Sequence, residues 1–119
     1  MPATASSTAE GYETASGDGV SVSPVPITKG QRVTVIYEGV LARQGAKAVV
    51  LHYGIGPGDW RHVRDVPMVE TAPGRFEASL EVPMDGRLEF CFRDGAYNWD
   101  NNSGRNWSYI IHSGGGSLA

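Results

Sequence analysis

Apolar and polar residues alternate with a period of two over most of the chain. The alternation is clearest in residues 33–37, 76–82, 88–93 and 107–112. Further strand candidates, with a less regular pattern, are residues 20–25, 48–53 and 61–65. A period of two places one apolar face against a core and a more polar face outward, which is typical of β-strands.

Turn signals rich in glycine separate these strands, as at Lys29-Gly30, Pro73-Gly74 and Asp85-Gly86. Short strands separated by such turns are typical of an antiparallel sandwich. The pattern therefore predicts an all-β, immunoglobulin-like β-sandwich of about seven or eight strands. Residues 38–47 are ambiguous, but Gly39 and Gly45 make a long helix there unfavourable.

Composition divides the chain into one ordered region and two ends. Residues 1–18 are rich in Ala, Ser, Thr and Glu and hold few apolar side chains, which predicts disorder. The glycine-rich residues 113–119 are expected to form a flexible tail. Residues 19–112 remain as a single β-sandwich domain.

Charge and cysteine content exclude several classes of function. The net charge of −3 provides no basic stripe for nucleic acid. No apolar run approaches the ~20 residues that a membrane-spanning helix needs. The single cysteine, Cys91, cannot form an intrachain disulfide. The three histidines have no metal-ligand spacing, and no loop has the pattern of a phosphate site, so neither a metal nor a cofactor is expected.

Two tryptophans lie outside the alternating segments. Trp60 follows the loop Gly56-Pro57-Gly58-Asp59, and Trp99 lies in a polar loop with almost no aliphatic residue. Such a ring either plugs the end of the sandwich or faces a ligand. Two of them in loops favour the ligand interpretation, because amphipathic rings are common in binding sites.

Asparagines follow Trp99 and have two interpretations. The side chains of Asn101 and Asn102 could bond to their own backbone in a turn, or they could bind ligand hydroxyls as both donors and acceptors. We expect both uses within this group of asparagines. A sugar ring offers the matching surface, with an apolar face for an aromatic ring and hydroxyls at its edge.

His52 is the third candidate. If Val49, Leu51 and Tyr53 face the core, His52 faces outward from the same strand. It precedes Trp60 by eight residues across a glycine-rich turn, so a hairpin could bring the two rings together.

These motifs together resemble the starch-binding carbohydrate-binding modules of family 25 and, with lower specificity, those of family 53. The resemblance spans residues 19–111 and is most distinctive at Trp99-Asp100-Asn101-Asn102. It departs from the family pattern at Ser103, where glycine is common, and at Trp107, where tyrosine is common. Alternation assigns Trp107 to the core.

The resemblance implies non-catalytic binding of α-1,4-glucan, as in starch, glycogen and maltooligosaccharides. It assigns the sugar platform to His52, Trp60 and Trp99, with Asn101 and Asn102 as hydrogen-bonding candidates. A starch- or glycogen-active enzyme, attached or associated, is the implied partner. The alternatives are an immunoglobulin-like protein-interaction module and a glycogen-sensing regulatory module.

The place of action follows from two features of the sequence. The N-terminus has no signal-peptide pattern and the chain has one cysteine, which together predict a cytoplasmic protein. An extracellular location is expected instead if the chain is a fragment of a larger secreted enzyme.

Overall fold

A computed structural model describes residues 19–113 of the chain. The predictions for residues 1–18 and 114–119 concern parts that lie outside this range. Within it the elements are β2 (Val20–Ser23), β3 (Ile27–Thr28), β4 (Arg32–Tyr37), α1 (Val40–Arg43), β5 (Val49–Gly56), β6 (Arg61–Pro67), β7 (Val69–Ala72), β8 (Arg75–Glu81), β9 (Gly86–Asp94), β10 (Trp99–Asp100) and β11 (Trp107–His112).

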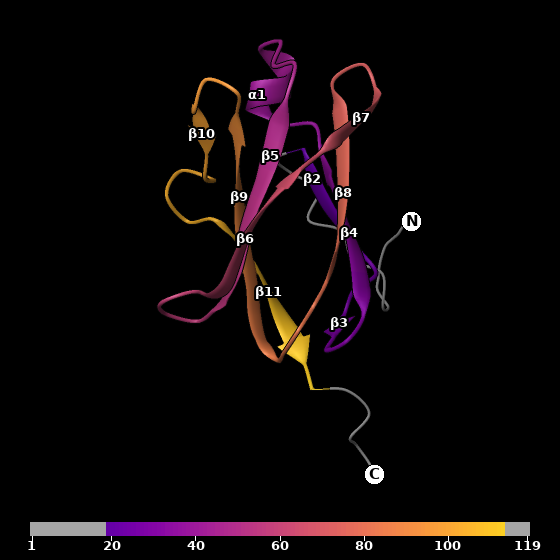
Figure 1. Cartoon of the computed structure of the whole chain (residues 1–119), viewed down its shortest axis with the longest axis vertical. Coiled ribbons are helices and arrows are strands. Elements are labelled where there is room, and N and C mark those ends of the chain that lie inside the picture. Colours follow the sequence, from indigo (N-terminus) through magenta and orange to yellow (C-terminus); the bar gives the residue numbers. More distant parts are fainter. Residues whose placement is uncertain (1–18, 114–119) are drawn as a thin grey trace, which may run out of the picture.

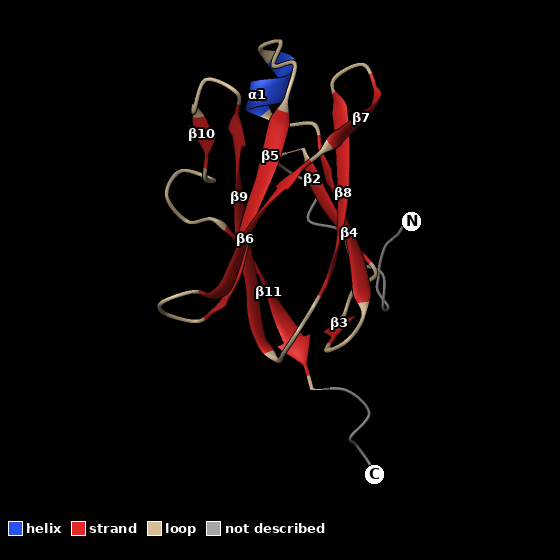
Figure 2. Ribbon diagram, viewed as in Figure 1, coloured by secondary structure: helices blue, strands red, loops and turns tan. Residues whose placement is uncertain are grey.

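The strands form two layers, which Figure 1 shows packed face to face. A six-stranded sheet has the order β3-β11-β9-β5-β6, with β10 also paired to β9. A four-stranded sheet has the order β2-β4-β8-β7. Figure 2 shows how little helix the described residues contain, namely α1 at one end of the sandwich. The predicted all-β sandwich is confirmed.

The core lies between the sheets, where the alternation predicted it. Val33, Val35 and Tyr37 of β4 are fully buried, and so are Phe90 and Phe92 of β9. Trp107, which alternation assigned to the core, is 6% exposed. Packing of these two inner faces removes apolar surface from water, which is the main stabilising contribution to such a fold.

One pair of strands departs from the antiparallel prediction. β3 and β11 run parallel, with Ile27 opposite Ile111 and Thr28 opposite His112. The predicted strand over residues 20–25 is accordingly shorter, because β2 ends at Ser23 and the chain crosses from one sheet to the other before β3. The ambiguous segment 38–47 contains only the four-residue helix α1, in agreement with the expectation from its glycines.

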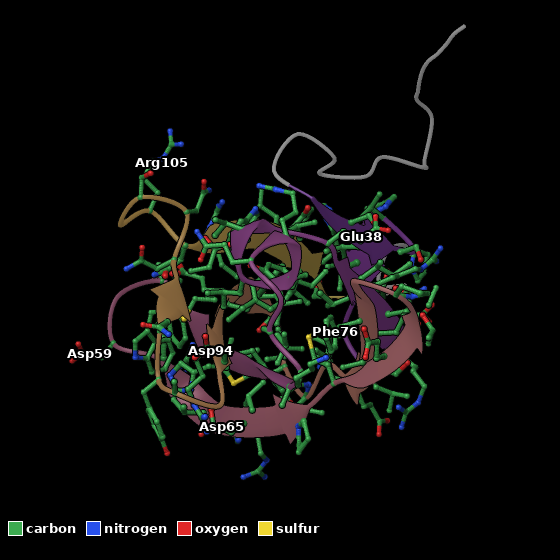
Figure 3. The ribbon with its side chains drawn as sticks, turned by 90° about the horizontal axis from the view of Figure 1, so that it is seen from above. Glu38, Asp59, Asp65, Phe76, Asp94 and Arg105 are labelled. Carbon is green, nitrogen blue, oxygen red and sulfur yellow. The ribbon has the colours of Figure 1, made fainter. Side chains whose placement is uncertain are left out.

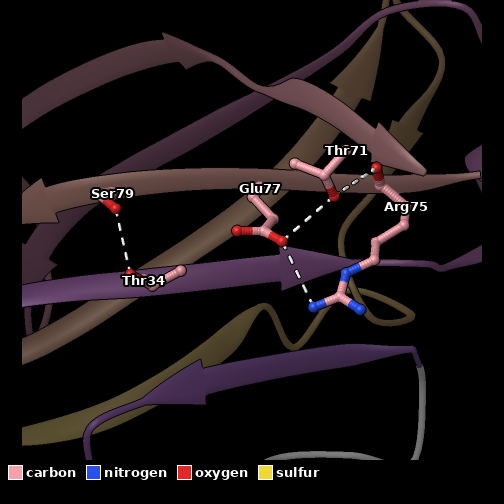
Figure 4. A network of polar contacts seen from close by, with 5 residues as sticks. All are labelled: Thr34, Thr71, Arg75, Glu77 and Ser79. Carbon is pink, nitrogen blue, oxygen red and sulfur yellow. Dashed lines mark hydrogen bonds and ion pairs between the residues drawn. The ribbon is translucent and has the colours of Figure 1, made fainter.

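The solvent face of the four-stranded sheet carries short polar contacts. Figure 4 shows the Thr34 and Ser79 hydroxyls within 3.2 Å of each other, and Glu77 between Thr71 and Arg75. The solvent face of the six-stranded sheet differs. Cys91 belongs to that outer face by alternation, yet it is only 6% exposed. Other side chains therefore cover this part of the sheet.

Candidate functional site

Three aromatic side chains meet on the outer face of the six-stranded sheet, and we call them the aromatic platform: His52, Trp60 and Trp99. The ring centroids of His52 and Trp60 are 5.6 Å apart, with the planes at 31°. The centroids of His52 and Trp99 are 5.5 Å apart, with the planes at 80°. Residues that are distant in sequence thus form one surface, as the family resemblance implied for these three.

The β5–β6 hairpin brings Trp60 back toward His52. Pairing of Ile55 with Arg61 places Trp60 next to the strand that carries His52. The Trp60 ring lies against Gly54, because a methyl group there would come within 2.8 Å of Trp60 Cβ and 2.9 Å of Cε3. Trp60 Nε1 donates a hydrogen bond of 3.1 Å to Glu89 Oε1 on β9. Gly54 leaves room for the indole, and Glu89 fixes its polar edge.

Trp99 is positioned by the short strand β10. Trp99 pairs with Arg93 and Asp100 pairs with Phe92, so successive side chains point to opposite faces of the sheet. Asp100 therefore turns inward, where its Oδ2 accepts a 2.6 Å hydrogen bond from the Tyr37 hydroxyl. Trp99 turns outward and is 47% exposed.

The Tyr37 hydroxyl also accepts a 3.1 Å hydrogen bond from the Leu41 backbone N–H of α1. Burial raises the pKa of Tyr37 far above its ordinary value, and the hydrogen bond to Asp100 raises it further. The hydroxyl therefore remains a donor at any physiological pH. Through it, the buried end of the four-stranded sheet holds the loop that presents Trp99.

His52 is oriented by a carboxylate on the neighbouring strand. Its Nδ1 lies 2.5 Å from Asp65 Oδ1, and the two residues are directly opposite in the β5–β6 pairing. An ionised carboxylate only accepts hydrogen bonds, so Nδ1 carries the proton. In the neutral ring Nε2 is then the acceptor. Sequence reasoning did not single out Asp65, although its register in the predicted hairpin was the signal that could have found it.

Asn101 and Asn102 both take part in the loop after Trp99. Asn101 Oδ1 accepts a 2.9 Å hydrogen bond from the Gly104 N–H, and Asn102 Nδ2 donates one of 3.0 Å to the Asn106 carbonyl. Asn102 has a φ of +58°, a left-handed conformation that asparagine tolerates better than most residues. The predicted turn chemistry is confirmed, and ligand binding by these two amides stays a prediction.

Several acidic residues lie on the same side of the sandwich. Figure 3 places Asp59, Asp65 and Asp94 on one side of the sandwich, away from Glu38 and Phe76. Asp94 accepts hydrogen bonds from Asn98 and Ala96, which hold its pKa below the ordinary value. Within residues 19–113, no group of three or more His, Cys, Asp or Glu side chains could hold a metal ion.

Cys91 lies opposite His52 in the β5–β9 pairing. Burial raises the pKa of its thiol to about 11, with smaller contributions from the negative charges of Asp65 and Asp100. At neutral pH the thiol is protonated, so it is a poor nucleophile. Cys91 is buried on the strand next to the one that carries His52.

The two tryptophans of the aromatic platform are not coplanar. Because their planes make angles of 31° and 80° with the imidazole, the two indoles are inclined to each other by at least about 50°, the difference between those angles. The surface is therefore an angled one. A pocket of about 500 Å³ lies elsewhere, at the paired strands β3 and β11, and is lined by Val25, Arg87 and Ile110 among others. None of the three platform residues lines it.

Comparison with known proteins gives one family and several relatives. The model of the starch/carbohydrate-binding module family 53 matches residues 33–90. An α-amylase of Clostridium acetobutylicum is 34% identical over 83 residues, covering 69% of this chain and 10% of the amylase. A β/α-amylase of Paenibacillus polymyxa is 28% identical over 81 residues, covering 67% of this chain and 6% of that enzyme. This chain therefore corresponds to a tenth or less of the length of these relatives.

A solved structure has the same fold. The iodinated family 25 carbohydrate-binding module of a Bacillus halodurans amylase superposes with a TM-score of 0.52 and 24% sequence identity. The match covers 76% of this chain and 90% of that one. At this identity the likeness bears on the fold alone. Among the described residues, no helix is long and apolar enough to cross a membrane.

Proposed function

We propose that this chain, which is a starch-binding carbohydrate-binding module of the kind represented by families 25 and 53, holds α-1,4-glucan on its aromatic platform. Sugar rings would stack on Trp60 and Trp99, and His52 would bind a hydroxyl through Nε2. The observation that carries this assignment is that the rings of Trp60 and Trp99 both lie within 5.6 Å of the His52 ring, measured between centroids, on one solvent face.

The inclination of the two indoles supports an α-glucan in particular. An α-1,4-linked chain is curved, so its successive sugar faces turn away from one another, whereas a flat row of rings suits the straight chain of cellulose. Platform rings inclined by at least about 50° fit the curved chain. The ligand is neutral and exerts no long-range attraction, which agrees with a net charge of only −3.

We further propose that the chain binds glucan without cleaving it. Glycosidases flank the bond that they cleave with two carboxyl groups about 5–9 Å apart. Here Asp100 is bound to Tyr37, and Asp94 is bound by its own loop. Incubation with maltoheptaose should therefore release no new reducing ends.

The relatives support attachment to an amylase as the setting of this module. They are named as amylases, and this chain matches a small part of each. We propose that it holds such an enzyme on its polymer. The relatives fit the extracellular alternative given above and offer no support for a cytoplasmic location. The alternative of a protein-interaction module is not favoured by them.

Retention on insoluble starch tests the assignment of the site. A ligand of disaccharide size on a half-exposed surface should bind with a Kd of about 0.1–1 mM. Trp60→Ala and Trp99→Ala should each weaken binding at least about tenfold, because each removes a stacking surface. Maltoheptaose should also change the tryptophan fluorescence of the parent protein.

Val69→Ala serves as the control, since Val69 is 65% exposed on β7 of the other sheet. It should leave retention unchanged, and all variants should keep the parent's circular dichroism. Unchanged retention in both tryptophan variants would place the glucan elsewhere. No fluorescence response and no retention of the parent protein would contradict glucan binding itself.

A further inference from the structure

Tyr97 is an exposed aromatic residue that the aromatic platform does not include. It lies in the loop between β9 and β10 and is 65% exposed. Its φ is +63°, a left-handed conformation that is costly for a bulky side chain. A strained residue of this kind persists only where its surroundings hold it, and such residues cluster at binding sites.

The loop that carries Tyr97 is held by Asp94. Asp94 Oδ1 accepts hydrogen bonds of 2.9 and 2.8 Å from the backbone N–H groups of Ala96 and Asn98, and Oδ2 accepts one of 3.0 Å from Asn98 Nδ2. The Tyr97 N–H in turn donates to the Asp94 carbonyl over 3.2 Å. The ring is therefore presented by an ordered turn, so that binding costs little conformational entropy.

A continuous path of contacts links Tyr97 to the platform. The guanidinium carbon of Arg93 lies 4.4 Å from the centroid of the Tyr97 ring. Arg93 Nη2 lies 3.9 Å from Asp65 Oδ2, and the other oxygen of Asp65 binds His52. One ring face thus rests on a cation, and most of the residue remains open to solvent beside the proposed glucan site.

We propose that Tyr97 is an additional glucan subsite that extends the aromatic platform beyond His52 and Trp99. This inference rests on the proposed function, because it needs a glucan already seated on the platform. A short oligosaccharide occupies the platform alone, and a longer one also reaches Tyr97. The ring stacks on the added sugar unit, and Arg93 beneath it keeps the ring in place.

Affinity as a function of chain length tests this subsite. Calorimetric titration with maltotriose and with maltoheptaose compares the parent protein with Tyr97→Gly and Tyr97→Phe. Tyr97→Gly should lose about fivefold in affinity for maltoheptaose and keep its affinity for maltotriose. Tyr97→Phe should keep both affinities, because the stacking face remains.

Thermal unfolding separates this role from a structural one. Glycine adopts a positive φ without strain, so Tyr97→Gly should unfold at the same temperature as the parent or higher. Equal losses for both sugars would mean that Tyr97 acts only through Arg93 and Asp65, and would overturn the subsite. So would an unchanged affinity for maltoheptaose. A parent protein that binds neither sugar would overturn the proposed function itself, which is a distinguishable result.

Discussion

The two solvent faces of this sandwich are built on the same alternation and carry different surfaces. On the four-stranded sheet, Thr34, Ser79 and Glu77 point outward and bond to one another or to their neighbours (Figure 4). On the six-stranded sheet, the corresponding positions of β5 include Gly54, beside His52. On the first face the strands' own side chains contact one another, whereas on the second face Gly54 leaves space for the Trp60 ring.

Loops fill that space with aromatic rings. Trp60 is contributed by the β5–β6 hairpin and Trp99 by the short strand β10. Neither residue lies in a segment where apolar and polar residues alternate. The comparison teaches that the strands supply the support and one ring of the aromatic platform, His52, while the β5–β6 hairpin and β10 supply the two indoles. This division agrees with the general placement of function on loops held by a rigid scaffold.

Gly54→Ala should cause the largest loss of glucan affinity, because it fills the space that distinguishes the solvent face of the six-stranded sheet. The added methyl group would lie 2.8 Å from Trp60 Cβ, closer than carbon atoms approach, so the indole must move off the strand. We expect about a tenfold loss of affinity for maltoheptaose, similar to removal of the ring. Calorimetric titration measures it.

Gly95→Ala is the matched control for that substitution. Gly95 lies in the β9–β10 loop, and a methyl group there meets no atom within 4 Å. It should bind as the parent does. An unchanged affinity in Gly54→Ala would show that the contact between Trp60 and the strand is not needed for binding.

Asp65→Ala should cause an intermediate loss of glucan affinity. It removes the carboxylate that holds the His52 Nδ1–H and fixes the ring, so the imidazole can turn and exchange its tautomers. We expect about a fivefold loss of affinity for maltotriose. Asp65→Asn should restore most of it, because the amide oxygen still accepts the Nδ1–H.

The opposite face supplies the control for this carboxylate. Glu77→Ala removes an acid that contacts Arg75 and Thr71 on the four-stranded sheet. It should leave affinity unchanged and alter stability by less than about 1 kcal/mol, as for exposed ion pairs. Equal losses in Asp65→Ala and Asp65→Asn would mean that Asp65 acts by its charge and does not orient His52.

Much of the difference between the two solvent faces could be predicted from the sequence. Alternation located the core, including Trp107, and it placed His52 on the outer face because Val49, Leu51 and Tyr53 point inward. The glycine-rich turn before Trp60 predicted the hairpin. Local patterns of this kind are reliable because burial on one face fixes the register of a strand.

Other features escaped prediction for physical reasons. β3 and β10 have two residues each, too few to show a period, and β7 is exposed along its whole length, so neither face is marked by burial. The parallel pairing of β3 with β11 and the bond between Tyr37 and Asp100 join residues that are far apart in sequence. The angle between the indoles depends on such long-range contacts, which no local pattern encodes.

The smallest expected effect is that of acid pH on the order of the β9–β10 loop, which carries Tyr97. The hydrogen bonds from Asn98 and Ala96 favour the ionised form of Asp94 and so lower its pKa below the ordinary 3.8. Because the pKa is lowered, the order that these hydrogen bonds give the loop is fully present above pH 3.8. It is lost as the pH falls through the lower pKa of the folded state. The Ala96 and Asn98 amide signals in NMR spectra should therefore shift together only below pH 3.8. In Asp94→Asn this shared titration should be absent; if it persisted, a group other than Asp94 would be ordering the loop.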